Sequence, residues 1–495
     1  MSSYRQIFKS TALIGATQAA NIIIGILRTK ALAVLLGPAG MGLAGAYLTV
    51  AGFVGGVTGL GLGNSGVRQI AEAAGMDDQA KIAKTILTLR RTSMLSGTLG
   101  MIIVLALSVP LSRVTFGNDT HAGALALMSI TLLFGGISAG QLAMLQGLRR
   151  LRDLAKSQVA GAFFGAIGSV VLVYFLREKG IALFLVANAA LVIVFSYWYA
   201  RKVNVIKVRL NLGETLSEAK GLLSFGVAFV LQNLLLGLGA YLSRVLIISG
   251  LGIEAVGVYT ATWTLSSYYV NIVLKAMGTD FYPRLTVAAN DHEMMNRLVN
   301  EQIEMGLLLA VPGVLGVMAL SPLVLQLFYS GAFVGGAEII RWQLIGVVLQ
   351  VLSWPLGYIQ LAKAKGKLFV ISEITSASLG LGYLVLALHL WHFEGIGIAA
   401  AGASLSYTFY LWYVGRQLSG FRFSRRCCKA VVFSFVTVGF AFVVTRFDQT
   451  GLGMLFGLTL AVSSSVVSFR ALQKLLGIDA WTLVRSKLGY GYCSS

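Results

Sequence analysis

The sequence predicts an all-α polytopic membrane protein of about 14 transmembrane helices, because it is apolar, poor in charge and built of long apolar blocks. Its 495 residues are 57% apolar and only 12% charged, and the mean hydropathy is +0.80. A soluble domain carries roughly 25% charged residues. A soluble multidomain protein would therefore lack the polar residues needed to cover its surface.

The predicted spans are apolar segments of about 20 residues, the length that crosses a bilayer as a helix. The last pair is the least regular, because a Ser-rich stretch at 463–468 weakens its second member. The segments lie near 10–36, 41–66, 85–110, 122–147, 157–176, 180–200, 221–250, 254–278, 302–329, 335–361, 368–389, 394–415, 430–446 and 452–472.

The distribution of Lys and Arg predicts the orientation of these spans. If the N-terminus is cytoplasmic, the outer connections hold only Arg113, Arg177, Lys179 and Arg446. Cytoplasmic loops of membrane proteins carry the excess of positive residues. Both termini are therefore predicted to lie inside, and the net charge of +20 reflects topology rather than nucleic acid binding.

An internal repeat predicts two lobes. Shifting the chain by 215 residues places Gly42 on Gly257 and Gly63 on Gly278. The two copies have the same orientation, so a pseudo-two-fold axis along the membrane normal should relate them. The predicted architecture is two six-helix lobes, 1–205 and 206–418, followed by an appended helix pair and basic cytoplasmic tail, 419–495. The inner connections Val67–Lys84 and Leu285–Asn300 are predicted to be amphipathic helices at the cytoplasmic interface.

Cations within the spans predict a binding site for an anion. Arg28 and Lys30 interrupt the first span and Arg244 the seventh; each costs about 2.5–3.5 kcal/mol at a helix centre facing lipid. Carboxylate partners are scarce nearby, so a positive cavity is the better explanation. The predicted ligands of an anionic head group are Arg28, Lys30, Arg244, Lys275 and Arg341.

Amides at helical spacing extend the same faces. Asn21 and Arg28 share one face of the first span, and Asn271 and Lys275 share one face of the eighth. Interhelical hydrogen bonding is the alternative role for such stripes. Trp342 and Trp354 offer faces for sugar rings or for packing. The predicted polar lining comprises Gln18, Asn21, Asn233, Asn271, Gln343 and Gln350.

Enzymatic functions are disfavoured by what the motifs lack. The four His residues have no catalytic or ligand spacing, and no nucleotide-binding Gly-rich loop occurs. Neither a large external loop nor an acidic metal-binding motif suggests a polymerase or glycosyltransferase. No metal, no cofactor and no nucleic acid partner are expected.

Several motifs resemble a known family. Leu36-Gly37-Pro38-Ala39-Gly40-Met41-Gly42 and Gln146-Gly147-Leu148-Arg149-Arg150 are similar to the polysaccharide-export branch of the multidrug/oligosaccharidyl-lipid/polysaccharide exporter superfamily. Trp342-Gln343-Leu344-Ile345-Gly346 and the residues that follow it to Lys365 resemble translocases for O-antigen units and enterobacterial common antigen. The resemblance covers about the first 415 residues.

This resemblance implies a flippase in the bacterial inner membrane. The implied substrate is an oligosaccharide on undecaprenyl pyrophosphate, carried to the periplasmic leaflet by alternating access, with polysaccharide polymerase and chain-length proteins as further partners. Val347 and Gln350 stand where the family often has an acidic residue and a Lys, which puts cation coupling through that pair in doubt. A multidrug or metabolite exporter of the same superfamily, and a flippase for the peptidoglycan lipid precursor, remain open alternatives.

Overall fold

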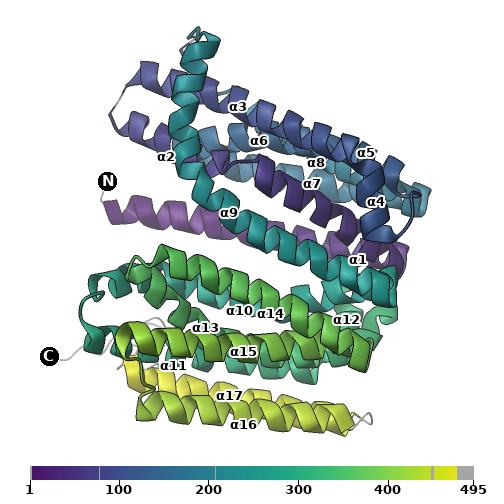
Figure 1. Cartoon of the computed structure of the whole chain (residues 1–495), viewed down its shortest axis with the longest axis vertical. Helices are drawn as coiled ribbons and strands as arrows, with labels where there is room; N and C mark the ends of the chain where they lie inside the picture. The colour runs from purple at the N-terminus through teal and green to yellow at the C-terminus, as the bar shows by residue number, and fades with distance from the viewer. Residues whose placement is uncertain (1–2, 77, 207, 448–450, 477–495) are drawn as a thin grey trace, which may run out of the picture. The chain divides into compact units, whose positions relative to one another are not determined.

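The computed structural model is helical throughout the part of the chain that it describes, residues 3–476 apart from 77, 207 and 448–450 (Figure 1). The basic residues of the predicted tail after residue 476 lie outside this part. Its helices are α1 Ser3–Thr58, α2 Leu62–Gly75, α3 Gln79–Ala106, α4 Ser108–Phe116, α5 Ala122–Met128, α6 Ile130–Gly147, α7 Leu151–Leu176, α8 Gly180–Ala200, α9 Leu212–Leu251, α10 Ile253–Val287, α11 His292–Ala319, α12 Ser321–Phe328, α13 Ala337–Ala362, α14 Gly366–Trp391, α15 Gly395–Ser419, α16 Arg425–Phe447 and α17 Leu452–Leu476, with 3₁₀ turns η1 Arg177–Lys179 and η2 Gly331–Gly336.

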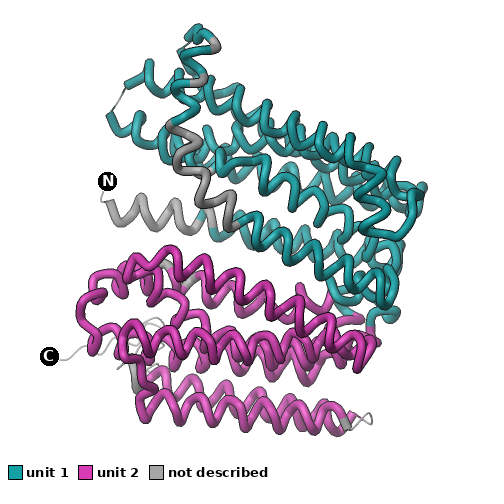
Figure 2. Tube along the Cα trace, viewed as in Figure 1, with its two compact units in different colours: residues 1–260, 327–333 teal, residues 261–326, 334–495 magenta. Residues whose placement is uncertain are grey.

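The chain divides into two compact units (Figure 2). Unit 1 comprises residues 1–260 and 327–333, and unit 2 comprises 261–326 and 334–495. The division by compactness falls within α10, and it assigns α16 and α17 to unit 2. The predicted six-helix lobes, 1–205 and 206–418, follow the repeat instead of compactness and stay a prediction.

The helices have the length and composition of membrane spans. Within the described residues, nine helical segments pass by length and hydropathy, or ten if α3 and α4, bent by 65° at their junction, count as one span. Two segments, Gly15–Thr58 and Leu151–Ala200, contain 44 and 50 residues, about twice the length needed at 1.5 Å per residue. Each coincides with two predicted spans. The all-α membrane fold is thus confirmed, while the count of 14 stays a prediction.

The break in α1 lies at the predicted outer loop. Gly37 has φ 65° and ψ −171°, a conformation that glycine adopts readily because it lacks a Cβ. Pro38 follows, and its fixed φ suits the first turn of a new helix. The sequence Gly37-Pro38 therefore ends one span and begins the next.

The two copies of the repeat meet at a local two-fold relation within unit 1. A Cβ on Gly42 would lie 2.1 Å from the carbonyl oxygen of Ile253, and a Cβ on Gly257 would lie 1.9 Å from that of Pro38. Pro38 and Gly42 correspond to Ile253 and Gly257 under the shift of 215 residues. The contact is therefore reciprocal, as expected where a pseudo-two-fold axis passes between α1 and α10.

Neither predicted interfacial segment is a single helix over its whole length. In the first, Val67–Lys84, α2 ends at Gly75 and α3 begins at Gln79, and Ile70 and Ala73 of α2 are fully buried in unit 1. The second segment, Leu285–Asn300, is a hairpin: α10 runs to Val287, and α11 begins after Asp291, whose side chain accepts a hydrogen bond from the Met294 amide at 2.9 Å. Its apolar residues have helical spacing because they fill the core of unit 2, rather than because they lie on a membrane surface.

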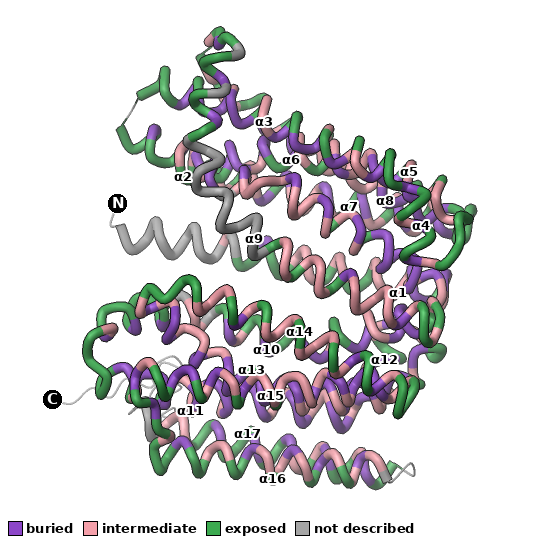
Figure 3. Tube along the Cα trace, viewed as in Figure 1, coloured by how far each residue is buried: buried purple, intermediate pink, exposed green. Residues whose placement is uncertain are grey.

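The core of unit 2 is built on α11 and α13, where buried residues concentrate (Figure 3). α16 and α17 pack against α11. Arg446 near the end of α16 lies 3.7 Å from Glu338 of α13, and it donates a hydrogen bond at 2.9 Å to Glu394, which precedes α15. Ion pairs thus attach the appended helix pair to the rest of unit 2.

Candidate functional site: a polar cavity in each unit

Unit 1 contains a cavity of about 240 Å³ between α1, α6, α7 and α8. Each of these helices contributes to its wall. The lining residues are Asn21, Arg28, Leu142, Ser157, Gln158, Ala162, Asn188 and Val192. Two of them, Asn21 and Arg28, are predicted site residues, two turns apart on one face of α1.

Among the described residues that line this cavity, Arg28 alone is charged. Its side chain is half-buried, and its Nε is fully buried with no hydrogen-bond partner within the described residues. The Oδ1 of Asn21 is buried and unsatisfied in the same way. A buried donor left unpaired costs about 1–3 kcal/mol, more when charged. Arg28 therefore presents a guanidinium whose natural partner is an anion that enters the cavity.

Arg244, the second predicted ligand in unit 1, occupies a different setting. It donates a long hydrogen bond of 3.3 Å to the carbonyl oxygen of Ala240 one turn earlier, and its guanidinium lies 5.8 Å from the ring centre of Tyr259. Its Nε is also buried without a hydrogen-bond partner in the described part of the chain. The described contacts do not join Arg244 to Arg28, so the predicted pair is not brought into one cluster.

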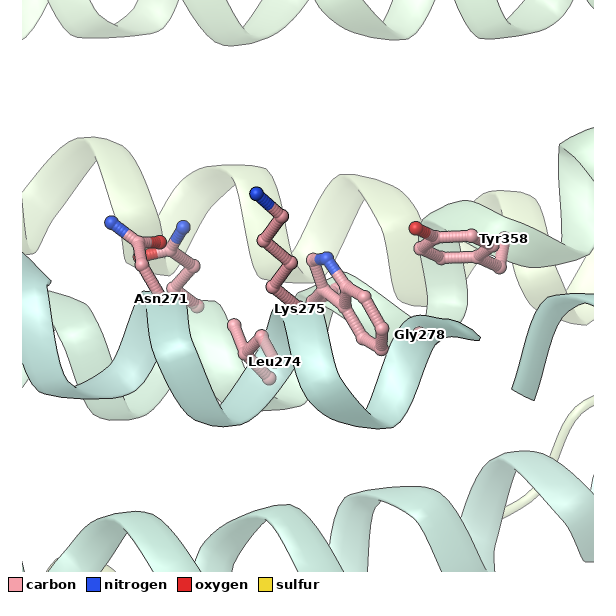
Figure 4. Close-up of a pocket in the computed structure, with 7 residues that line it drawn as sticks. Asn271, Leu274, Lys275, Gly278 and Tyr358 are labelled. Carbon is pink, nitrogen blue, oxygen red and sulfur yellow. The ribbon is translucent and has the colours of Figure 1, made fainter. Parts of the chain in front are cut away.

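Unit 2 contains a larger cavity, of about 550 Å³, between α10 and α13. Its lining combines amides, a cation and aromatic rings: Asn271, Leu274, Lys275, Gly278, Gln350, Trp354 and Tyr358. The side chains of Asn271 and Lys275 extend on the same side of α10, and the hydroxyl of Tyr358 is directed toward the same space (Figure 4). Three predicted residues, Asn271, Lys275 and Gln350, therefore line one cavity.

The remaining predicted residues lie elsewhere. Arg341 is buried and ion-paired with Glu338, one turn earlier on α13. Gln343 is buried and accepts a hydrogen bond from Ser266 at 3.2 Å, which is the packing role weighed for such amides. Lys30 is half-buried, and Gln18 and Asn233 are exposed.

Several lining residues were not predicted. Asn188 interrupts an apolar run in α8, and Tyr358 continues the spacing of Gln350 and Trp354 by one further turn. The sequence positions of Asn188 and Tyr358 could therefore have identified both residues. Gln158 lines the same cavity as Arg28 because α1 packs against α7, and its sequence position carries no such signal.

No carboxylate lines either cavity in the described part of the chain. Within the described residues, no group of three or more His, Cys, Asp or Glu side chains is placed to hold a metal ion. The two cavities can offer cations, amides and aromatic faces to a ligand. This chemistry suits anions and sugars better than cationic substrates.

The sequence matches known families over most of its length. The model of a family described as polysaccharide biosynthesis protein matches residues 31–336. The Lipid III flippase of Escherichia coli K12 is 23% identical over 408 residues, which are 82% of this chain and 96% of that protein. The same values hold for the Lipid III flippase of Shigella flexneri.

Solved structures share the fold. An inward-facing multidrug resistance MATE family transporter of the MOP superfamily superposes with a TM-score of 0.65 and 16% identity, covering 79% of this chain and 94% of that one. The lipid II flippase MurJ in an inward closed conformation gives 0.61 and 12%, covering 94% and 100%. At these identities the likeness establishes the fold alone.

Proposed function

We propose that this chain, which belongs to the polysaccharide biosynthesis protein family, moves an undecaprenyl-pyrophosphate-linked oligosaccharide from the cytoplasmic to the periplasmic leaflet by alternating access. At the superfamily level it is a lipid-linked oligosaccharide flippase, a multi-pass protein of the inner membrane. Its relatives are flippases and transporters rather than enzymes. The proposed cargo is an O-antigen or common-antigen repeat unit. Polysaccharide polymerase and chain-length proteins are proposed partners.

The observation that carries this proposal is the guanidinium of Arg28 in the unit 1 cavity, whose buried Nε has no hydrogen-bond partner within the described residues. A cation without a counter-ion in a membrane span is retained where a ligand or pathway needs it. A pyrophosphate supplies two phosphate groups to which Arg can donate bidentate hydrogen bonds. We assign Arg28 and Arg244 to the head group as successive ligands during transport, assisted by Lys30. Lys275, which the sequence predicted as a further ligand of the head group, lies in the unit 2 cavity.

Among the residues that the structure describes, neither cavity lining includes a carboxylate, which argues against the rival exporter. A transporter for cationic drugs needs negative charge in its cavity, because an unpaired cation in a low-dielectric site is strongly disfavoured. The peptidoglycan lipid precursor is also an anionic polyprenyl pyrophosphate, so charge alone does not separate it from the proposed cargo. The functional test must therefore include it.

Complementation tests the proposal. The chain and its Arg28→Ala and Arg244→Ala variants are expressed at equal abundance in strains that lack their own O-antigen, common-antigen or peptidoglycan-precursor flippase. We expect the wild type to restore surface glycan in one of the first two strains. The activity of each Ala variant should fall at least tenfold, because an anion contact to a charged donor is worth about 1.5–3 kcal/mol.

Arg297→Ala is the matched control, since Arg297 is exposed and pairs with Glu301 on the surface of α11. It should behave as wild type. Full activity in both cavity variants would assign the arginines a structural role. Rescue of only the peptidoglycan-precursor strain would replace the proposed cargo, and no rescue of any strain would contradict the flippase assignment.

A further inference from the structure

We propose that the unit 2 cavity is a subsite for an acidic sugar, one that carries a carboxylate on its ring, within the oligosaccharide; this rests on the proposed function. The relevant residues form two facing stripes. Asn271, Lys275 and Gly278 follow one face of α10 at i, i+4 and i+7. Gln350, Trp354 and Tyr358 follow one face of α13 at i, i+4 and i+8.

The stripes give the cavity a graded chemistry along its length. Asn271 and Gln350 place amides at one end, Lys275 lies next to them, and Trp354 and Tyr358 place rings at the other end. Amides donate to and accept from sugar hydroxyls, and an aromatic face packs against the C–H face of a pyranose ring. A monosaccharide therefore finds both kinds of contact within about two helical turns.

The aromatic wall is rigid. The indole of Trp354 lies directly over Gly278, where an added Cβ would come within 2.9 Å of two ring carbons. Its ring centre is 4.6 Å from that of Tyr358 and 6.1 Å from that of Phe281. A ring held in this way loses little conformational entropy when a ligand stacks on it. The absence of a side chain at Gly278 thus leaves space for the Trp354 indole.

The cation indicates which sugar the cavity takes. Lys275 is exposed, and no hydrogen bond or ion pair joins it to another residue in the described part of the chain. The nearest acidic residue along α10, Asp280, pairs with Arg284 at 3.3 Å. A single ammonium next to two amides matches one carboxylate, whereas the pyrophosphate, with at least two charges, is better served by the guanidinium of Arg28. The volume of about 550 Å³ falls in the range of small-ligand sites.

Binding by purified protein tests the subsite apart from transport. The probes are methyl β-D-glucuronide and methyl β-D-glucoside, which differ only in the carboxylate, and the readout is tryptophan fluorescence. We expect the wild type to bind the glucuronide at least fivefold more tightly. Lys275→Gln should abolish this preference and leave glucoside binding within twofold, because it removes only the charge. Trp354→Ala should weaken both probes.

Lys367→Gln is the matched control, since Lys367 is an exposed lysine of unit 2 outside the cavity. Unfolding midpoints check that each variant is folded. If Trp354→Ala does not fold, Trp354→Phe replaces it, because it keeps an aromatic ring at this position. An unchanged preference in Lys275→Gln overturns the subsite, and so does equal binding of the two probes by wild type. Inorganic pyrophosphate, the other source of anionic charge, is added as a competitor of the glucuronide. If pyrophosphate displaced the glucuronide from the wild type but not from Lys275→Gln, Lys275 would bind pyrophosphate and the proposal would be overturned.

A second measurement separates this proposal from the flippase function. Flipping is followed in liposomes with two polyprenyl-pyrophosphate disaccharides, one ending in glucuronic acid and one in glucose. Loss of preference for the acidic substrate in Lys275→Gln supports the subsite within a working flippase. If the wild type binds the free glucuronide but flips neither lipid, the flippase function fails while the binding site stands.

Discussion

At the scale of single residues, Gly42 and Gly257 allow the two copies of the repeat to approach backbone to backbone. Each lacks the Cβ that would meet a carbonyl oxygen of the opposite helix, at 2.1 and 1.9 Å. Such distances are far below van der Waals contact, and the opposing atoms belong to the backbone and cannot rotate away. The close approach of α1 and α10 therefore depends on both glycines.

Replacement of either glycine should destabilise the fold. We expect Gly42→Ala and Gly257→Ala each to lower the free energy of unfolding by about 1–3 kcal/mol, because the helices must separate to admit the methyl group. The unfolding midpoint of detergent-purified protein, followed by fluorescence-detected size exclusion, measures the change. Gly25→Ala is the control: nothing lies within 4 Å of its Cβ position, so its effect should be neutral or slightly stabilising. Equal midpoints for all variants would contradict the close contact.

At the scale of elements, α13 connects the core of unit 2 to the appended pair. Its Glu338 pairs with Arg341 on the same helix and lies 3.7 Å from Arg446 of α16. The side chain of Arg341 is only 10% exposed, so it depends on Glu338 for charge compensation. This pairing gives a structural reason for a cation that the sequence alone favoured as a substrate ligand.

Neutralising Glu338 should therefore be costly. We expect Glu338→Gln to lower the free energy of unfolding by about 3 kcal/mol, since removal of one partner leaves a buried charge uncompensated. Thermal unfolding of the purified variant measures this loss. Glu301→Gln removes the partner of the exposed Arg297 and should change stability by less than about 1 kcal/mol. If the two variants lost the same stability, the pair at Glu338 would be no more than a surface ion pair.

At the scale of the whole molecule, the sequence predicts what depends on local composition. Apolar blocks identify the helices, and Gly37-Pro38 identifies the break in α1, because these signals act within one span. The lining of the cavities depends on tertiary packing: Asn188 and Arg28 line one cavity because α8 and α1 both pack against α7. The hairpin at 285–300 was missed because a buried core face and a membrane-facing surface have the same helical spacing.

The distribution of positive charge makes the last prediction, which concerns orientation. Cytoplasmic retention of Lys and Arg places the connection that contains Lys365 inside and the connection that contains Asn118 outside. Asn118 and Lys365 are both exposed, so a cysteine at either position should be accessible to a reagent. In a cysteine-free background, Asn118→Cys should react with a membrane-impermeant maleimide in spheroplasts whose inner membrane is intact.

Lys365→Cys should react only after the membrane is permeabilised, and both variants should be labelled equally in detergent. The reverse pattern would invert the protein and place both termini in the periplasm. It would also reverse the direction in which the membrane potential acts: with the interior negative, outward movement of an anion is favoured by about 2.3 kcal/mol per charge per 100 mV. The same labelling therefore decides whether the potential can assist export of a pyrophosphate-linked cargo along the predicted direction.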